Sequence, residues 1–413
     1  MKTADPELMR AINRFHVMDT IRQHGPISRV EIAQAIELSP TTISAITATL
    51  LDDQLITPRA MVPLSEAGRG RPRVMLELNP DAAYVVGVKL SPHQISVATT
   101  NFRADVLKSL TLPVRTDRQT AEVIADIVED GIRHCVADAG LPFEKIAGVC
   151  VGLPGIIEHE SGICRQSPIF RQPDVPFATA LGSRLGVEIS LESDVNLATL
   201  AEHWFGHGRG HSDFIVVAVE HGLGLGIMHK GELMRGAKGL SADLGDLVIW
   251  PGEGAEPPGR LADFASETAI AAAAVPAQVA RLDGPMPQPQ GFDRALAAAR
   301  AGDPAAAAVF AKAGTALGYA VANLITLNAP GRLIIAGSAL RAGDLLLEPL
   351  RATVDRLTPP ALRRAVAIIE HHWSDDVWAR GAAALTLRRL YSAPWSTSGP
   401  AVITTTTAMG RAI

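Results

Sequence analysis

The chain has 413 residues, 47% of them hydrophobic and 20% charged, with a formal net charge of -5; this composition excludes a disordered chain and is typical of a globular protein of two or three domains. Its three cysteines, Cys135, Cys150 and Cys164, are odd in number and share no CxxC spacing, so they indicate neither a disulfide framework nor a zinc cluster. The sequence has neither an apolar run of roughly 20 residues nor an apolar signal segment at its N-terminus, so we expect a cytoplasmic protein without a membrane partner.

Residues 1–80 predict a compact head that begins with three helices. Between residues 6 and 24 the apolar side chains recur with a period near 3.6, which indicates an amphipathic helix. Ser28 and Glu31 have the spacing of a capping box, in which each side chain satisfies a backbone N–H of the other residue, so a second helix starts there. Ser39 followed by Pro40 indicates the start of a third helix. Two helices joined by a tight turn predict a helix-turn-helix.

The third helix carries the residues that we expect to contact DNA. Ile43, Ile46 and Leu50 form its buried stripe. Its other face carries small uncharged residues: Pro40, Thr41, Thr42, Ser44 and Thr47. Short side chains allow the helix to enter the major groove N-terminus first, where hydroxyls and helix N-terminal amides bind phosphate. The alternative is an ordinary three-helix bundle whose polar face meets water.

An arginine-rich segment follows the third helix. Residues 54–80 are typical of strand, turn and strand, with the sequence GRGRPR at or just after the turn. A β-hairpin behind a recognition helix is the wing of a winged helix, and Arg69, Arg71 and Arg73 would then lie along a narrow, negative minor groove. The alternative is a solvated basic linker. Residues 1–80 hold nine basic and nine acidic residues against 29 and 34 in the remainder, and a neutral head permits DNA binding when its arginines share one face.

From residue 84 the pattern predicts a duplicated α/β body. Three β-rich runs precede a helical stretch near 118–138 and a buried strand, and a similar order returns from residue 213. Two similar halves imply a ligand cleft between them. We therefore expect a winged helix-turn-helix over 1–80, a body over 81–392 with lobes at about 81–205 and 206–392, and a flexible tail over 393–413. The segment 285–291, PMPQPQG, is typical of a surface loop.

Four blocks in the same order carry a family resemblance over nearly the whole chain. They are VGLPGIIEHESG, LESDVNLATLAEHWFGHGRG, GLGLGIMHKGELMRGAKGLSADLGD and RGAAALTL. With them the chain resembles the ROK family of repressors, open reading frames and sugar kinases. The resemblance implies an actin-like, RNase H-like ATPase-type fold of the sugar-kinase kind for the body. The N-terminal winged helix, absent from the kinases, is what the family's transcriptional repressors carry, including those that respond to xylose and N-acetylglucosamine.

The phosphate-binding loops of the family's kinases are replaced here. Where the kinases have DxGGT, this chain has KLSPH from Lys89 to His93, and where they have GTG it has Glu220-His221-Gly222. Phosphoryl transfer depends on positioning and on stabilising the charge of the phosphates, and an acidic side chain in such a loop repels them. The resemblance therefore implies a protein without kinase activity and without a cofactor.

The family's zinc site is replaced as well. Its CxCGxxGCLE segment is EGAEPPGRLA here, residues 253–262, and its histidine ligand is Asp246. No thiolate or imidazole remains in that set, so we expect no structural metal. Arg260 opposite Asp246 could replace the metal bridge with an ion pair, and a solvated loop is the alternative.

The resemblance carries the sugar pocket over only in part. Asp194 matches the aspartate that acts as general base in the kinases and holds a sugar hydroxyl in the repressors. Four other pocket positions are changed, an asparagine to Ser193, a glutamate to Asp243, a histidine to Asp246 and a glutamate to Ala262. Because carboxylates accept hydrogen bonds from the hydroxyls of a polyol, we expect ligand contacts at Ser193, Asp194, Asp243 and Asp246. The alternative is that these residues are helix caps and loop acids.

These patterns together predict a transcription regulator, a repressor of carbohydrate-metabolism genes that binds an operator in double-stranded DNA as a homodimer or homotetramer. A sugar or sugar derivative in the cleft would shift the placement of the heads and so change operator affinity. Two alternatives stay open. One is a ROK-type sugar kinase with an added DNA-binding head, and the other is a binding module whose ligand is a partner protein.

Overall fold

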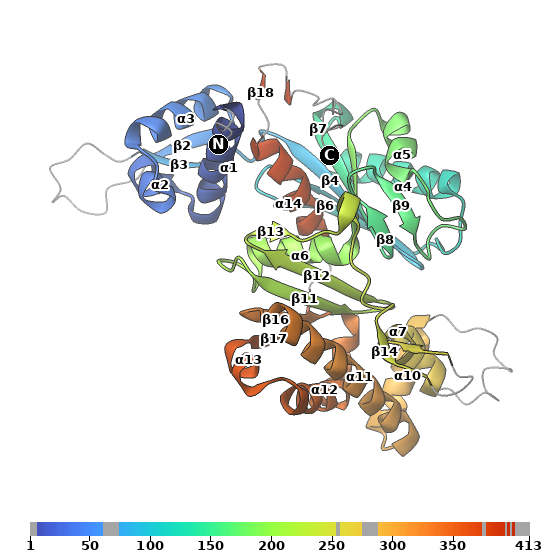
Figure 1. The fold of residues 1–413 in the computed structure, drawn as a ribbon. Helices are drawn as coiled ribbons and strands as arrows, with labels where there is room; N and C mark the ends of the chain where they lie inside the picture. The colour runs from blue at the N-terminus through green and yellow to red at the C-terminus, as the bar shows by residue number, and fades with distance from the viewer. Residues whose placement is uncertain are drawn as a thin grey trace, which may run out of the picture.

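The computed structural model describes residues 6–60, 74–252, 257–274, 288–373, 377–392, 395–396 and 399–400. A helical head at the N-terminus is followed by a body of two lobes, each built around a five-stranded sheet (Figure 1). The head contacts the body through its first helix, which packs against the last long helix, α14 (Val377–Ser392).

The head has the arrangement of a winged helix. Its helices α1 (Pro6–His24), α2 (Arg29–Ile36) and α3 (Pro40–Asp52) agree with the predicted ones. Both predicted helix starts are confirmed, because Ser28 and Glu31 form the full capping box and the Ser39 side chain accepts the N–H of Thr42. The strands β1 (Ile27–Ser28), β3 (Val74–Leu78) and β2 (Ile56–Ala60) form an antiparallel sheet in that order, so β2 and β3 are the two strands of the expected hairpin.

The first sheet, which we call the sheet of lobe 1, has the order β10-β7-β4-β5-β6. The strands β4 (Tyr84–Ser91), β5 (Gln94–Thr100) and β6 (Val106–Leu112) are antiparallel neighbours, and β7 (Ile146–Leu153) and β10 (Ile189–Ser193) extend the sheet in parallel. Alternate residues of β4 face opposite sides. Val86 and Val88 pack with α4 (Ala121–Asp138) and α5 (Phe177–Leu185), whereas Val85 belongs to the core that includes α14. The turn η1 (Phe143–Lys145) and the hairpin of β8 (Ile156–Glu158) and β9 (Ile163–Gln166) complete the lobe.

Lobe 2 repeats this topology with the order β13-β12-β11-β16-β17. Its first strand, β11 (Phe214–Val219), pairs antiparallel with β12 (Leu223–His229) and parallel with β16 (Arg332–Ala336), as β4 does with β5 and β7. β13 (Glu232–Leu233) and β17 (Ala367–His371) form the two edges. The other elements of the lobe are α7 (Ala262–Ala265), α8 (Glu267–Ala274), α10 (Gln288–Arg300), α11 (Pro304–Asn328), α12 (Asp344–Leu357), α13 (Pro360–Ala365), η2 (Ala237–Gly239), η3 (Ser338–Ala342) and the hairpin of β14 (Val248–Trp250) and β15 (Gly259–Arg260). The predicted duplicated α/β fold is confirmed.

Two helices are exchanged between the lobes. The helix α6 (Asp194–Phe205) follows the last strand of lobe 1 but packs on β11 and β12 of lobe 2. The helix α14 follows the last strand of lobe 2 but packs on β4 and β7 of lobe 1. The two helices also pack on each other, and glycine makes this possible, because a Cβ at Gly381 would lie 1.8 Å from the carbonyl oxygen of Leu197. A change in the angle between the lobes must therefore change this crossing.

Three further segments bear on the sequence predictions. The predicted surface loop at 285–291 is wrong from residue 288 onward, because α10 begins at Gln288 and proline is compatible with the first turn of a helix; residues 285–287 lie outside the described part. By length and composition α11 could cross a membrane, but it packs against α12 with Phe310, Leu317 and Ile325 buried, as a core helix does. Of the predicted tail, only β18 (Trp395–Ser396) and β19 (Gly399–Pro400) are described, and they pair with each other.

Candidate effector cleft and DNA-contacting surface

The start of α3 presents a small polar surface, as DNA contact requires. Pro40, Thr41 and Ser44 are exposed and Thr42 is half-buried. The hydroxyl of Ser44 donates to the carbonyl oxygen of Pro40 at 2.8 Å, and the Oγ of Ser39 accepts the N–H of Thr42 at 3.1 Å. These hydrogen bonds are local to the helix, so the short side chains leave its first turn open to a phosphate. DNA contact by these residues stays a prediction.

Thr47 differs from its predicted place on the exposed face. Its side chain is fully buried. Its Oγ1 accepts a hydrogen bond from Nε of Arg29 at 2.8 Å and donates to the carbonyl oxygen of Ile43 at 2.8 Å. Thr47 therefore holds α2 against α3 and does not face a DNA groove in this conformation. The exposed face of α3 continues instead through Ala45, Ala48 and Thr49. These residues are not among those selected from the sequence.

The arginines of the predicted wing, Arg69, Arg71 and Arg73, lie outside the described residues. The strands on either side are described, and they pair from Ile56 opposite Leu78 to Ala60 opposite Val74. Ala60 and Val74, the described residues on either side of this segment, therefore lie opposite each other at one end of the hairpin. Its contact with the minor groove stays a prediction.

Asp194 is the first residue of α6 and lies within reach of charges from both lobes. Its Oδ1 accepts the N–H of Val195 at 2.8 Å. Burial raises the pKa of the Asp194 carboxyl, the positive charge of Lys89 opposes this shift, and the negative charge of Glu220 adds to it. Ser193 is the cap of the same helix, with its Oγ accepting the N–H of Asn196 at 3.3 Å. The structure thus supports the cap interpretation for Ser193 and gives Asp194 a distinct electrostatic environment.

An ion pair joins the two loops at which the chain departs from the kinases. The Nζ of Lys89 lies 3.1 Å from Oε2 of Glu220, and the two side chains are 19% and 28% exposed. Lys89 lies on β4 of lobe 1, whereas Glu220 directly follows β11 of lobe 2. The pair therefore bridges the two lobes. Sequence reasoning identified each altered loop but not their contact, because the partners are 131 positions apart.

A second contact between the lobes lies beside this ion pair. The rings of His93 and His221 are 5.6 Å apart. On the lobe 2 side, Nδ1 of His221 lies 3.9 Å from the buried carboxylate of Glu267. That carboxylate accepts hydrogen bonds from Ser338, at 2.8 Å, and from Arg341. Burial lowers the pKa of His221, although Glu267 opposes this shift, so the contact with His93 involves a neutral ring near pH 7.

Asp243 and Asp246 are exposed and belong to the loop after η2. The Oδ1 of Asp243 accepts the N–H groups of Gly245, at 2.9 Å, and Asp246, at 3.3 Å. Oδ1 of Asp246 lies 2.8 Å from Nη1 of Arg260, which is the ion pair that the sequence offered in place of a metal bridge. With side chains about half exposed, such a pair contributes at most about 1 kcal/mol. These contacts favour the loop-acid interpretation, and ligand binding by either residue stays a prediction.

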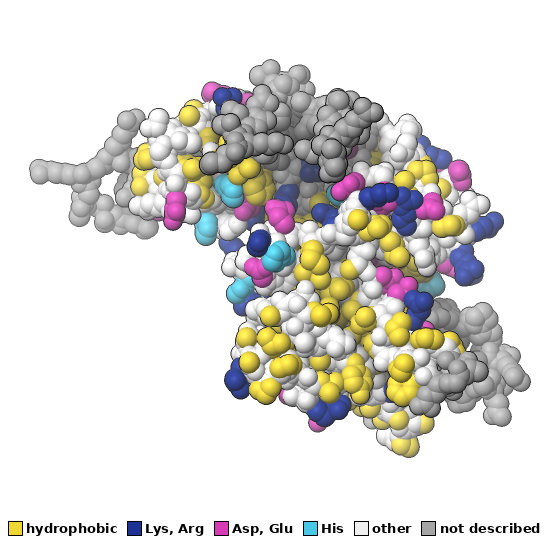
Figure 2. All heavy atoms as spheres, viewed as in Figure 1, with side chains coloured by type: hydrophobic (Ala, Val, Ile, Leu, Met, Phe, Trp, Pro, Cys, Tyr) yellow, Lys and Arg dark blue, Asp and Glu magenta, His cyan; other side chains and the backbone are white. Residues whose placement is uncertain are grey.

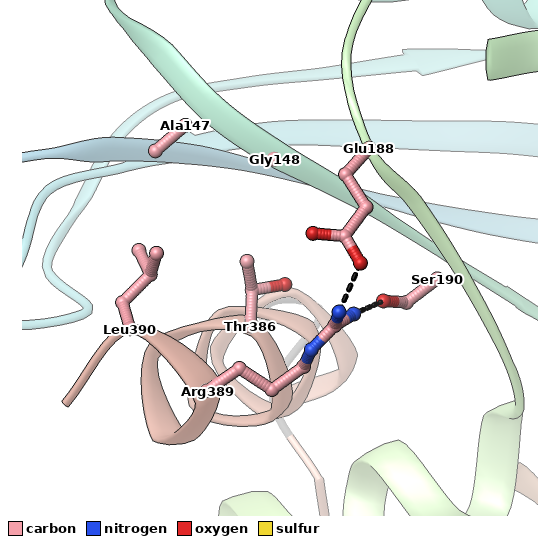
Figure 3. Close-up of a pocket in the computed structure, with 7 residues that line it drawn as sticks. All are labelled: Ala147, Gly148, Glu188, Ser190, Thr386, Arg389 and Leu390. Carbon is pink, nitrogen blue, oxygen red and sulfur yellow. Dashed lines mark hydrogen bonds and ion pairs between the residues drawn. The ribbon is translucent and has the colours of Figure 1, made fainter. Parts of the chain in front are cut away.

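A separate open groove of about 790 Å³ runs along α5 and β10 of lobe 1. None of the predicted ligand residues lines it. Figure 3 shows a separate, small pocket that shares Glu188, Ser190 and Arg389 with this groove. There Arg389 of α14 bonds Glu188 and donates to Oγ of Ser190 at 3.0 Å, so these polar groups attach α14 to lobe 1.

The described residues contain no group of three or more His, Cys, Asp or Glu side chains placed to hold a metal ion. Residues 253–256, which are part of the replaced zinc segment, lie outside the described part. Within the described part of that segment, Arg260 contacts Asp246.

Comparison with known proteins agrees with the fold of both parts. The model of the ROK family matches residues 85–389, and that of the MarR family matches residues 12–60. A protein named putative xylose repressor from Caldicellulosiruptor sp. (strain Rt8B.4) is 28% identical over 363 residues, covering 84% of this chain and 88% of the relative. A glucokinase from Thermotoga maritima is 30% identical over 325 residues, covering 74% of this chain and 98% of the enzyme. A crystal structure of a ROK family transcriptional regulator, described as a homolog of the E. coli MLC protein, superimposes with a TM-score of 0.76 at 26% identity, covering 93% of this chain and 97% of that one.

Proposed function

The chain belongs to the ROK family, and we propose that it is a DNA-binding transcriptional repressor of carbohydrate-metabolism genes whose body binds a sugar or sugar derivative. The observation that carries this proposal is a winged-helix head on a body whose two altered phosphate loops are joined by Lys89 and Glu220. The relative named as a regulator superimposes over 93% of the chain, head included, whereas the glucokinase aligns with 74% of it. We place the boundary of the head near residue 80, between β3, which ends at Leu78, and β4, which begins at Tyr84.

The same ion pair is the reason to propose that the body transfers no phosphate. A phosphate between these loops would have to displace Glu220 from Lys89, and the Glu220 carboxylate would repel it. Phosphoryl transfer is almost entirely positioning and charge stabilisation. The kinase alternative requires ATP-dependent phosphorylation of a sugar. Turnover of D-glucose, D-xylose or N-acetylglucosamine with ATP would contradict the proposal.

Asp194 is the residue that we propose as the main anchor of the sugar. Its carboxylate accepts hydrogen bonds only, which suits a ligand rich in hydroxyl donors. Burial disfavours the charged carboxylate in the absence of ligand, and hydrogen bonds from a polyol would offset that cost. Ser193, Asp243 and Asp246 are proposed as secondary contacts. Binding between the lobes would change their angle and so the placement of the head.

We further propose that the protein acts in the cytoplasm as a homodimer or homotetramer. Paired heads read two half-sites of a palindromic operator, one helical turn of DNA or a multiple of it apart. The exposed start of α3 would enter the major groove, and the arginines of the wing would follow the minor groove.

The test is a gel shift on DNA that flanks the gene, at two salt concentrations and with and without each of the three sugars. We expect a specific complex whose affinity changes with one sugar. Replacing Arg69 and Arg71 together by alanine should weaken operator binding and reduce the slope of log affinity against log salt by about 1 for each lost phosphate contact. Arg115→Ala is the matched control, because Arg115 is an exposed arginine of the body that pairs with Asp117. Unchanged affinity in the double variant would show that the arginines are only a linker, and a protein that no sugar stabilises against heat would favour a partner protein as the ligand.

A further inference from the structure

The head is docked on the adjoining ends of the two exchanged helices. Trp204, near the end of α6, stacks on Tyr391, near the end of α14, with ring centres 5.8 Å apart and an angle of 16° between the rings. From the head, the guanidinium carbon of Arg22 lies 4.0 Å from the centre of the Trp204 ring. The Nη1 of Arg22 also donates to the carbonyl oxygen of Trp204 at 3.3 Å. Arg22 is 6% exposed and is held by Asp19 at 2.8 Å, so its position is fixed from the side of the head.

Further contacts make this junction a packed interface. Arg388 of α14 lies 5.4 Å from the centre of the Phe15 ring in the head and also bonds Glu232 of lobe 2 at 2.5 Å. Arg209 donates to the carbonyl oxygen of Gln23. Apolar residues of α1 belong to the same buried core as the stacked rings of the body: Val17, Met18 and Ile21. On the face drawn in Figure 2, charged and histidine side chains lie beside this junction.

The helix α6 connects this junction directly to the cleft. Asp194 and Trp204 are ten positions apart on one helix, which corresponds to about 15 Å along its axis. This helix packs mainly on lobe 2, where Gly224 and Gly226 of β12 lie so close to it that a Cβ at either would collide with its side chains, although its Leu197 also reaches Gly152 of β7 in lobe 1.

The helix α14 packs mainly on β4 and β7 of lobe 1, although its Arg388 also bonds Glu232 of lobe 2. The hydroxyl of Tyr391 donates to the carbonyl oxygen of Phe102 at 2.9 Å, and Arg389 bonds Ser190 and Glu188 (Figure 3). Trp204 and Tyr391 therefore lie on helices that pack mainly on different lobes, although their rings are in contact.

We propose that the Trp204–Tyr391 stack, contacted by Arg22, transmits a change in the angle of the cleft to the DNA-binding head. When the lobes move, α6 shifts against α14 and the two rings must re-stack. Arg22 holds both the ring and the backbone of Trp204, whereas the rest of α1 packs against α14, so a shift of α6 against α14 changes the surface on which α1 rests. Packed interfaces change between discrete arrangements and do not deform continuously, which turns a small shift in the cleft into a defined new placement of the head. This inference rests on the proposed function, because it requires a head that binds DNA.

The experiment uses operator DNA as the probe, since coupling between two sites is reciprocal and no sugar need be known. Amide hydrogen exchange of residues 194–200, the start of α6, is measured on the full chain with and without a DNA fragment selected for binding. In the wild type we expect operator DNA to change the exchange rate of these amides at least threefold. In Arg22→Ala the DNA-dependent change should disappear, while the fragment still binds through the head.

Two further variants separate a loss of coupling from a loss of folding. Arg133→Ala is the matched control, because Arg133 also lies over an aromatic ring, that of Phe143, and pairs with Glu129, but it belongs to lobe 1 away from the head; its response to DNA should equal that of the wild type. Arg22→Lys keeps the charge beside Asp19 but loses the planar stacking group, so it should reduce the response even if Arg22→Ala does not fold. Failure of the wild type to bind any DNA would refute the proposed function. Binding without a change at residues 194–200, or an equal change in both Arg22 variants, would overturn this inference alone.

Discussion

The ion pair between Lys89 and Glu220 gives the sharpest test of the reasoning about the cleft. The perturbation is a double-mutant cycle with Lys89→Met, Glu220→Gln and the double variant. Two unit charges 3.1 Å apart attract each other by about 5 kcal/mol at an effective dielectric constant near 20. Desolvation of two half-buried groups and the ordering of the lysine side chain offset most of this attraction. We therefore expect a net coupling of about 1–2 kcal/mol, above that of an exposed pair and below that of a fully buried one.

The assay is urea unfolding of the four proteins at pH 7, in low and in high salt. The coupling energy is the difference between the effect of the double variant and the sum of the single effects. The charge-swapped protein, Lys89→Glu with Glu220→Lys, should recover part of the stability that either single reversal loses. A coupling below about 0.3 kcal/mol, which is the level of independent sites, would show that the two side chains do not hold the lobes together in solution. The argument against phosphate binding would then lose its main support.

Three other predictions concern single positions. Asp194→Asn should raise the free energy of unfolding at pH 7 by about 1 kcal/mol while abolishing sugar binding. Because burial raises the pKa of this carboxyl, its own contribution to stability is fully present below pH 3.8 and is lost as pH rises, so urea unfolding should show the gain from the substitution vanish toward pH 3.8. Burial lowers the pKa of His203 to about 4, so the stability that its neutral form contributes is present above pH 6.5 and is lost as pH falls, by about 2 kcal/mol at pH 5. In His203→Gln the difference in free energy of unfolding between pH 7 and pH 5 should shrink by this amount. An unchanged difference between the two pH values would contradict the prediction. Gly381→Ala should lower the free energy of unfolding by about 3 kcal/mol or more, because its Cβ would collide with the backbone of Leu197. In the control Gly331→Ala, where a Cβ meets nothing within 4 Å, the free energy of unfolding should stay within about 0.5 kcal/mol of that of the wild type.

Features that depend on neighbouring residues could be predicted from the sequence. The capping box at Ser28 and Glu31 and the start of α3 at Ser39 form as expected, because cap hydrogen bonds join residues two or three positions apart. The start of α10 at Gln288 could not be predicted in the same way, because proline is common in loops but is also compatible with the first turn of a helix. The burial of Thr47 could not be predicted, because the packing of α2 decides which residues of α3 are covered, and Arg29 of α2 donates a hydrogen bond to the Thr47 hydroxyl.

The same distinction between local and long-range features applies to the candidate site. The loss of each phosphate loop is visible in the sequence, since it is a change of residue type at Lys89 and at Glu220. Their ion pair is not visible, because it depends on how the two first strands of the lobes face each other across the cleft. The pair of Asp246 and Arg260 could be anticipated because both stand where the family's metal ligands stand and are joined by one short hairpin.

The strength of the bridge across the cleft also limits what an effector must do. A ligand shifts an equilibrium between two lobe angles only by the difference in its affinity for the two. If the ion pair of Lys89 and Glu220 stabilises one angle between the lobes over the other by about 1–2 kcal/mol, the arrangement with that angle is populated roughly 5- to 30-fold more than the other in the absence of ligand. An effector held by Asp194 at the start of α6 needs a comparable difference in binding energy to reverse it, which a few hydrogen bonds can supply. A kinase cleft must instead stabilise a transferring phosphate in one closed geometry. On the proposed function, replacing both phosphate loops by a moderate ion pair would remove what phosphoryl transfer needs and leave a cleft whose two states differ by an energy that a small sugar can overcome.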